Sequence, residues 1–281
     1  MAVDPFSQLD PINGTPVTIV FGTFNYRDVI NKWINHALSI CDHWRIICLD
    51  QELVDWLNEM GYGTNAVYLY DVFPDMTRHN LNNLEKNSRV RIIFTLRKKL
   101  FYALAKSRRD FIHSDADAFW LQDPRPWLAQ HAEFDLLISQ GTYGPRSQFI
   151  RHHFTLCAGF FLCHANARTQ NYFRQVAEAK WYLDQKSMNE VLLNDSEACW
   201  QIQQSSAWWS DTGKIGGEWQ KISDSERSCS SPDYICISPE IIKGKFSNGL
   251  TVGVIPMHLV TRINYQWAPP PFVLHINTNK K

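Results

Sequence analysis

The sequence lacks three features that would place the protein in a large class at once. It has no excess charge, because 28 lysines and arginines balance 28 aspartates and glutamates. It has no apolar run long enough to cross a bilayer, and its first twenty residues lack the pattern of a secretion signal. Balanced charge disfavours nucleic acid and anionic lipid as partners. We therefore expect no transmembrane segment and a cytoplasmic location, with a Golgi luminal domain trimmed of its anchor as the alternative.

The cysteines do not form a recognisable framework. The chain has seven, with no CxxC pair and no metal-ligand spacing, and the odd number leaves at least one thiol unpaired. We expect reduced, mostly buried cysteines, and a Cys229–Cys236 disulfide is the alternative. No repeat or low-complexity linker divides the 281 residues, of which 44% are apolar. This composition indicates a single domain with a sizeable core.

Short apolar runs alternate with helical patterns, mainly in the first half of the chain, which is typical of an α/β sandwich with parallel strands. The sequence predicts strands at 17–21, 45–49, 66–70, 134–138 and 156–163, and helices at 29–40, 52–60, 89–106 and 166–180. A nucleotide commonly binds where the first strand of such a fold ends. Thr23 and Asn25 follow that strand, so they are candidate nucleotide contacts.

Arg97 lies in the middle of the apolar face of the helix predicted at 89–106. On a helical wheel this face is formed by Ile93, Leu100, Phe101 and Leu104. An unpaired guanidinium in such surroundings is costly, so an anion should lie nearby. The anion is either an aspartate of the protein itself or a group of the ligand, such as its phosphates or sugar.

Two carboxylates, Asp115 and Asp117, directly follow an apolar run that begins at Phe111. Carboxylate oxygens suit hard cations such as Mg²⁺ and Mn²⁺, whose shell substrate phosphates often complete. If the strand continued through these residues, its alternation would point both side chains the same way. The Asp-x-Asp tripeptide alone is a weak signal, but its position after an apolar strand strengthens it.

The run HSDADAFWLQDP resembles the DxDxxWLxDP segment of nucleotide-diphospho-sugar transferases. The resemblance implies the GT-A fold, a Rossmann-like α/β/α sandwich with a mixed, mostly parallel central sheet, over residues 17–281. The nucleotide-binding part would cover about 17–124 and the sugar and acceptor part about 125–281. Residues 1–16 would form an N-terminal extension, and whether all of it belongs to the natural protein stays open. Asp115 and Asp117 would hold Mn²⁺ or Mg²⁺ on the diphosphate of a nucleotide sugar, with a UDP-sugar favoured.

Further segments resemble motifs of the same family, in the same order. Arg97-Lys98-Lys99 resembles its Arg-x-Lys helix, which implies that Arg97 and Lys99 contact the donor. Asp184-Gln185-Lys186-Ser187-Met188-Asn189 resembles DQxxFN, with methionine in place of phenylalanine. Asp184 would then bind sugar hydroxyls; its alternative role is a helix N-cap. The usual Asn-x-Gly before an aromatic pair is replaced by Cys157-Ala158-Gly159.

The end of the sequence carries the last resemblance. His275-Ile276-Asn277 resembles a late His-x-Asn that precedes a lysine. This implies that His275 is the third protein ligand of the metal, through a neutral ring nitrogen. Lys280 or Lys281 would neutralise the leaving diphosphate; the alternative for both lysines is a disordered tail.

The resemblance implies a metal-dependent glycosyltransferase that retains the anomeric configuration, with Asp184, Gln185 and Arg97 as catalytic residues and a glycan or other hydroxyl as acceptor. The segment 200–232, rich in serine, glycine and tryptophan, is predicted to be irregular surface structure. Trp208, Trp209 and Trp219 within it are acceptor candidates, unless they fill the core. Two other functions stay open: a non-catalytic glycan- or nucleotide-sugar-binding protein, and a metal-dependent nucleotidyltransferase or phosphohydrolase.

Overall fold

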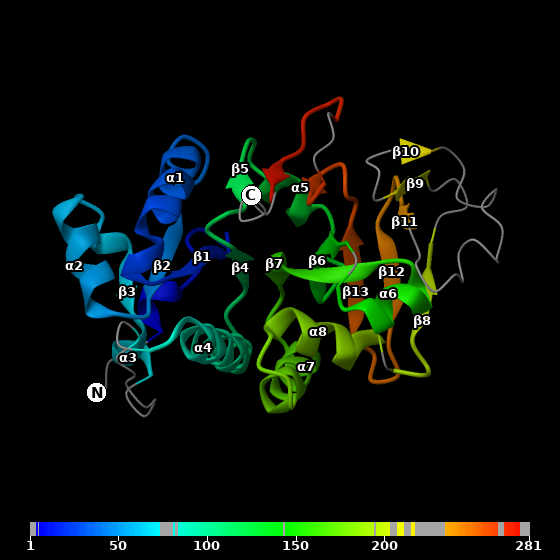
Figure 1. Ribbon diagram of the computed structural model, residues 1–281, viewed down its shortest axis with the longest axis horizontal. Helices are drawn as coiled ribbons and strands as arrows, with labels where there is room; N and C mark the ends of the chain where they lie inside the picture. Colours follow the sequence, from blue (N-terminus) through cyan, green and yellow to red (C-terminus); the bar gives the residue numbers. More distant parts are fainter. Residues whose placement is uncertain are drawn as a thin grey trace.

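A nine-stranded sheet forms the centre of the computed structural model (Figure 1). The structure describes residues 4, 6–73, 81, 84–142, 144–193, 195–202, 207–210, 215–216, 234–263 and 267–275. The strand order is β3-β2-β1-β4-β7-β6-β13-β12-β8. The strands are β1 (Val17–Gly22), β2 (Trp44–Cys48), β3 (Ala66–Tyr68), β4 (Phe111–Ser114), β6 (Leu136–Gly141), β7 (Thr155–Cys163), β8 (Cys199–Gln201), β12 (Ile242–Lys245) and β13 (Thr251–Ile255).

The sheet is mixed, and most of its strands run in one direction. Strand β1 pairs in parallel with β2 and β4, β2 with β3, and β6 with β13. Strand β7 is antiparallel to β4 and β6, and β12 is antiparallel to β13 and β8. Only β7 and β12 therefore run against the rest of this sheet. This is the mixed, mostly parallel sheet that the family resemblance implies.

Helices cover both faces of the sheet, which completes the α/β/α sandwich. One buried cluster joins the sheet to α4, α7 and α8, and a second joins it to α1, α2 and α5. In Figure 1 the helices of the first group lie below the sheet. The helices are α1 (Arg27–Ala37), α2 (Gln51–Glu59), α3 (Leu69–Val72), α4 (Lys86–Lys106), α5 (Arg125–Ala129), α6 (Arg146–His152), α7 (Ala167–Glu178) and α8 (Asp184–Leu193), with short 3-10 turns at Ser7–Leu9, Phe24–Tyr26 and Gly63–Asn65. No helix in the described ranges is long and apolar enough to cross a membrane.

Two small sheets flank the large one. Strands β9 (Ala207–Ser210), β10 (Ile215–Gly216) and β11 (Tyr234–Ile237) form one, in the order β10-β9-β11. Strands β5 (Phe119–Trp120), β14 (Val260–Thr261) and β15 (Val273–Leu274) form the other, in the order β14-β15-β5. The second sheet matters for function, because it brings the segment around residue 275 beside the chain that follows Asp117.

The predicted elements are confirmed, apart from two segments. The strand predicted at 66–70 ends at Tyr68, where the chain turns into α3. The segment 200–232 contains the strands β9 and β10, so the prediction of irregular structure throughout is wrong. Strand β9 pairs with β11, a partner so distant in the sequence that local composition does not reveal it. Trp208 and Trp209 belong to β9, whereas Trp219 and Cys229 lie outside the described residues.

The segment before β1 packs onto the domain. Leu9 is fully buried within the cluster that contains α4 and α7. Arg109 forms ion pairs with Asp4 and Asp10, and its Nε lies 2.7 Å from Asp10 Oδ1. The described part of 1–16 therefore contributes to the core, although the sequence predicted only an extension.

Candidate active site

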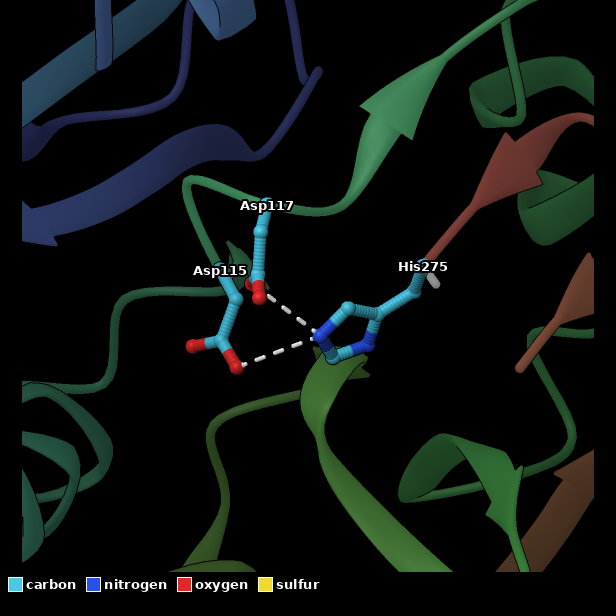
Figure 2. A group of neighbouring side chains, drawn as sticks. All are labelled: Asp115, Asp117 and His275. Carbon is cyan, nitrogen blue, oxygen red and sulfur yellow. Dashed lines mark hydrogen bonds and ion pairs between the residues drawn. The ribbon is translucent and has the colours of Figure 1, made fainter. Parts of the chain in front are cut away.

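The two aspartates of the Asp-x-Asp motif lie in a turn. Strand β4 ends at Ser114, and Asp115 continues it only through its N–H, which donates to Gly159 O at 2.7 Å. Ala118 N then donates to Asp115 O at 3.0 Å and closes the turn. The expectation that strand alternation aligns Asp115 with Asp117 is therefore wrong. The turn nevertheless brings both carboxylates to one partner, His275 (Figure 2).

His275 completes a group with the donor types of a divalent metal site. Its Nε2 lies 3.1 Å from Asp117 Oδ1 and 3.6 Å from Asp115 Oδ2. One ligand atom of each residue lies within 4.8 Å of the others. His275 follows β15, and its N–H donates to Thr261 O at 2.9 Å. Two carboxylates and an imidazole suit Mn²⁺ or Mg²⁺ supplemented by phosphate oxygens.

Gly159 leaves the space in which these side chains meet. A Cβ added at this position would lie 2.0 Å from His275 Cε1 and 2.7 Å from Asp115 Oδ2. A side chain here would displace His275 or Asp115, so the glycine allows these two side chains to meet beside β7. The backbone of β7 therefore lies close to two of the three candidate metal ligands, His275 and Asp115.

Arg97 connects Asp184 to the candidate metal-ligand group, which consists of Asp115, Asp117 and His275. Its guanidinium Nη2 lies 2.9 Å from Asp115 Oδ1 and 3.0 Å from Asp184 Oδ2, and the residue is 7% exposed. The anions expected from the wheel are therefore aspartates of the protein itself. Burial opposes the charge of Arg97, but Asp115 and then Asp184 outweigh burial and raise its pKa. Burial would likewise raise the pKa of Asp115, yet Arg97 and then His113 hold it far below its usual range.

Asp184 is the first residue of α8 and is almost fully buried. Burial raises its pKa, against the opposing effect of Arg97. Gln185 N donates to Asp184 Oδ1 at 2.6 Å, and the Gln185 side chain donates to Gly144 O at 2.8 Å. Asn189 fixes the helix to β7, because its amide bonds both the N–H and the C=O of Leu156 at 2.8 Å. Helix α8 thus holds the Asp184 carboxylate beside Arg97.

Two neighbouring lysines of α4 have different positions. Lys99, the residue selected from the sequence as a donor contact, is exposed and does not line the cavities beside Arg97. Lys98 is buried, and its ammonium donates to Ala179 O, Trp181 O and Ser187 Oγ. It therefore anchors the chain between α7 and α8. A sequence motif that contains both lysines does not show which of them faces the interior.

Two cavities meet at Arg97, Asp115 and Asp117. The first, of about 570 Å³, lies beyond the ends of β1 and β2 and is lined by Thr23 and Asn25, among others. The end of β1 is fixed there by Asp50, whose carboxylate accepts from Phe24 N at 3.0 Å and caps α2 through Leu53 N at 3.1 Å. The second cavity, of about 410 Å³, is lined by Gly159, Asp184, Gln185, Lys186, Arg262 and His275. Lys280 lies outside the described residues.

Three further residues contact the site without having been singled out as site residues from the sequence. His113 Nε2 lies 2.9 Å from Arg97 Nη2 and 3.2 Å from Asp115 Oδ1, and burial lowers its pKa to about 4, so it is neutral. Cys157 Sγ lies 3.7 Å from His275 Nδ1 and accepts from Arg262 Nη1 at 2.6 Å. Their signals were weak: His113 precedes Asp115 by two residues, and Cys157 replaces a motif asparagine. No sequence pattern indicates Arg262.

The charges of Cys157 and His275 depend on each other. Burial would raise the pKa of the Cys157 thiol, but Arg262 and then His275 outweigh it and lower the pKa to about 7. Burial likewise opposes protonation of His275, but Cys157 and Asp117 raise its pKa to about 9. His275 must therefore lose a proton before its Nε2 can bind a metal.

Proteins with an α/β sandwich commonly bind their ligands beyond the carboxyl ends of the parallel strands. In this protein the carboxylates and both cavities lie at that edge of the sheet. The sequence model of the nucleotide-diphospho-sugar transferases matches residues 39–281. The chain therefore belongs to this family, and the protein is a glycosyltransferase.

Several solved glycosyltransferases resemble the chain at low identity. The apo structure of the bifunctional glycosyltransferase WbbM is 14% identical, with a TM-score of 0.42, over 65% of this chain and 38% of that one. The galactosyltransferase LgtC, in complex with donor and acceptor sugar analogues, is 18% identical, with a TM-score of 0.41, over 63% of this chain and 70% of that one. Apo mouse xyloside xylosyltransferase 1 is 10% identical, with a TM-score of 0.44, over 64% of this chain and 82% of that one. No curated protein matches the chain.

Proposed function

We propose that the protein transfers a sugar from a nucleoside-diphosphate donor, with UDP favoured, to a hydroxyl of a glycan or other acceptor. We further propose that the reaction depends on Mn²⁺ or Mg²⁺ and retains the anomeric configuration. The observation that carries the proposal is the convergence of Asp115, Asp117 and His275 at the junction of two cavities. One cavity suits the nucleotide and the other suits the sugar with its acceptor.

Asp115, Asp117 and His275 would hold the divalent ion, which when bound supplies a Lewis acid for the diphosphate. Thr23 and Asn25 line the larger cavity and would contact the nucleotide. Lys99 and Lys280 remain donor-contact predictions from the sequence alone. The cytoplasmic location also remains a prediction, as do Trp208, Trp209 and Trp219 as acceptor contacts.

Charge separation explains why Asp184 and Gln185 suit the reaction centre. When the bond between the anomeric carbon and the diphosphate oxygen breaks, its electron pair leaves with the diphosphate and the sugar becomes cationic. Asp184 and Gln185 line the smaller cavity, and their carboxylate and amide oxygens would stabilise that cation. In a retaining reaction the acceptor oxygen bonds to the face from which the diphosphate departs. The proton of the acceptor hydroxyl can then pass to the departing phosphate oxygen, so no strong protein base is required. Arg97 keeps Asp184 in place through its ion pair.

The first prediction concerns the metal ligands. Nucleotide sugars should bind the wild type with Mn²⁺ and not with a chelator, whereas Asp117→Asn should bind them about 100-fold or more weakly, because one charged ligand is lost. Asp28→Asn is the matched control, since its side chain is 87% exposed on α1. Calorimetric titration with a panel of donors measures the binding, and product analysis detects the transferred sugar.

Two other outcomes would contradict the proposed glycosyl transfer. If the wild type binds no nucleotide under any condition, the proposal fails and a non-catalytic glycan-binding protein takes its place. If the donor is consumed and the products are the nucleoside monophosphate and the sugar 1-phosphate, the protein cleaves the diphosphate and is a phosphohydrolase.

A further inference from the structure

Resting on the proposed function, we infer that Arg262 is a further catalytic residue, which binds the donor's diphosphate and stabilises its charge as it leaves. The inference comes from the position of Arg262, from the weakness of sulfur as its acceptor and from the two ion pairs that hold Arg97. None of these depends on the lysines near the end of the sequence.

Arg262 lies where a diphosphate held by the metal ligands would be within reach. It follows β14, is partly buried, and lines the smaller cavity together with Asp117, Asp184 and His275. A guanidinium stays charged at neutral pH. Arg262 therefore carries its positive charge at the side of the site that contains the metal ligands.

The partner of Arg262 is a poor one for a guanidinium. Within the described ranges its side chain donates to Cys157 Sγ, from Nη1 at 2.6 Å. Sulfur is a weak acceptor, and a guanidinium carries five N–H donors in a planar fork. Phosphate oxygens accept charge-assisted hydrogen bonds, often two from one arginine. A phosphate that enters the cavity can therefore compete with the thiol for Arg262.

Arg97 is less free to move to a phosphate than Arg262. Its Nη2 already contacts two aspartates, Asp115 and Asp184, at 2.9 and 3.0 Å. Moving Arg97 to a phosphate would leave both carboxylates buried without their cation, which is strongly unfavourable. Among the described residues, Arg262 would leave only Cys157 Sγ, which is one group instead of two. Arg97 is therefore held by the protein's own carboxylates, and its contact with the donor remains a prediction from the sequence. Arg262, in contrast, can turn to a ligand without breaking an ion pair with any aspartate that the structure describes.

Binding of a nucleoside diphosphate can be separated from binding of its nucleoside. We would titrate UDP and uridine, and GDP and guanosine, into the wild type, Arg262→Met and Arg262→Lys at saturating Mn²⁺. Arg262→Met should weaken binding of the accepted diphosphate about 10- to 100-fold, as expected for lost charge-assisted hydrogen bonds, and should leave the nucleoside unchanged. Arg262→Lys should recover part of the loss, because the charge returns without the planar fork. Arg174→Met, an exposed arginine of α7 paired with Glu178, is the matched control.

Measuring the binding of Mn²⁺ alone tests whether Arg262 has a merely structural role. Its affinity, measured by electron paramagnetic resonance, should stay within about threefold of the wild type in Arg262→Met, because Arg262 is not a metal ligand. A parallel loss of Mn²⁺ and nucleoside binding would overturn the inference, since Arg262 would then only support the fold. Unchanged diphosphate binding in Arg262→Met would also overturn it and leave the proposed function intact. A wild type that binds diphosphate no better than nucleoside would overturn both.

Discussion

Gly159 controls how closely β7 approaches the metal-ligand group. Its carbonyl accepts from Asp115 N at 2.7 Å, and its Cα faces His275 at a distance that excludes a Cβ. Both Asp115 and His275 are thus positioned against one residue that contributes no side chain. A substitution here acts on ligand geometry rather than on charge.

Gly159→Ala should therefore weaken Mn²⁺ binding about 10-fold or more, because His275 or Asp115 must move to make room for the methyl group. The fold should persist, since the cavities beside the residue can absorb a displaced imidazole. Titration with Mn²⁺ and a thermal unfolding curve measure the two properties. Wild-type Mn²⁺ affinity in Gly159→Ala would show that the site does not need the close approach.

Asp135 holds three elements together at the opposite end of the sheet. It immediately precedes β6 and is almost fully buried. Its carboxylate accepts from Thr251 N at the start of β13, from Arg168 of α7 and from Asn166, the N-cap of α7. Burial raises the pKa of Asp135, but Arg168 and then Thr251 outweigh burial and lower it. The charged form therefore stabilises the fold.

Asp135→Asn should lower the free energy of unfolding by about 1–3 kcal/mol at neutral pH, since charged hydrogen bonds at a buried position are lost. Because folding lowers the pKa, the stabilisation is complete above the ordinary aspartate value of 3.8 and disappears as the pH falls through the folded-state pKa. Urea unfolding at pH 7 and pH 3 measures the difference, with Asp28→Asn as the exposed control. A difference of equal size at both pH values would contradict this explanation.

The whole molecule builds the site from distant parts of the chain. Asp117 and His275 are 158 residues apart in the sequence, and the Cys157–Arg262 contact spans 105 residues. The nucleotide side comes from the ends of β1 and β4, whereas Asp184 and His275 come from the later part of the chain. A ligand at the junction would therefore contact segments that are far apart in the sequence.

UDP with Mn²⁺ should accordingly raise the unfolding temperature of the wild type. At about 100 times the dissociation constant, binding adds roughly 2.7 kcal/mol, which corresponds to roughly 5 °C or more for a domain of this size. Asp117→Asn should show little of this shift at the same concentrations. Differential scanning fluorimetry measures both, and an equal shift in the presence of a chelator would argue against a metal-linked site.

The fold and part of the site could be predicted because their signals are local. Apolar periodicity identified the strands and helices that frame the site, and the wheel showed that Arg97 needs an anion. Asp115 and Asp117 could be selected because only one residue separates them in the sequence. The contact of Cys157 with Arg262 could not, because it depends on how two segments far apart in sequence cross. The difference between Lys98 and Lys99 also depends on packing, since adjacent residues of a helix point about 100° apart.

The order in which the chain is made has a consequence for the small sheet that positions His275. Every strand of the nine-stranded sheet lies at or before Ile255, and His275 follows them in the sequence. During synthesis a ribosome therefore releases all strands of the nine-stranded sheet before it releases His275, the third of the proposed metal ligands. A nascent chain can therefore form the nine-stranded sheet while it still lacks His275, so the proposed metal site would be completed only after the sheet.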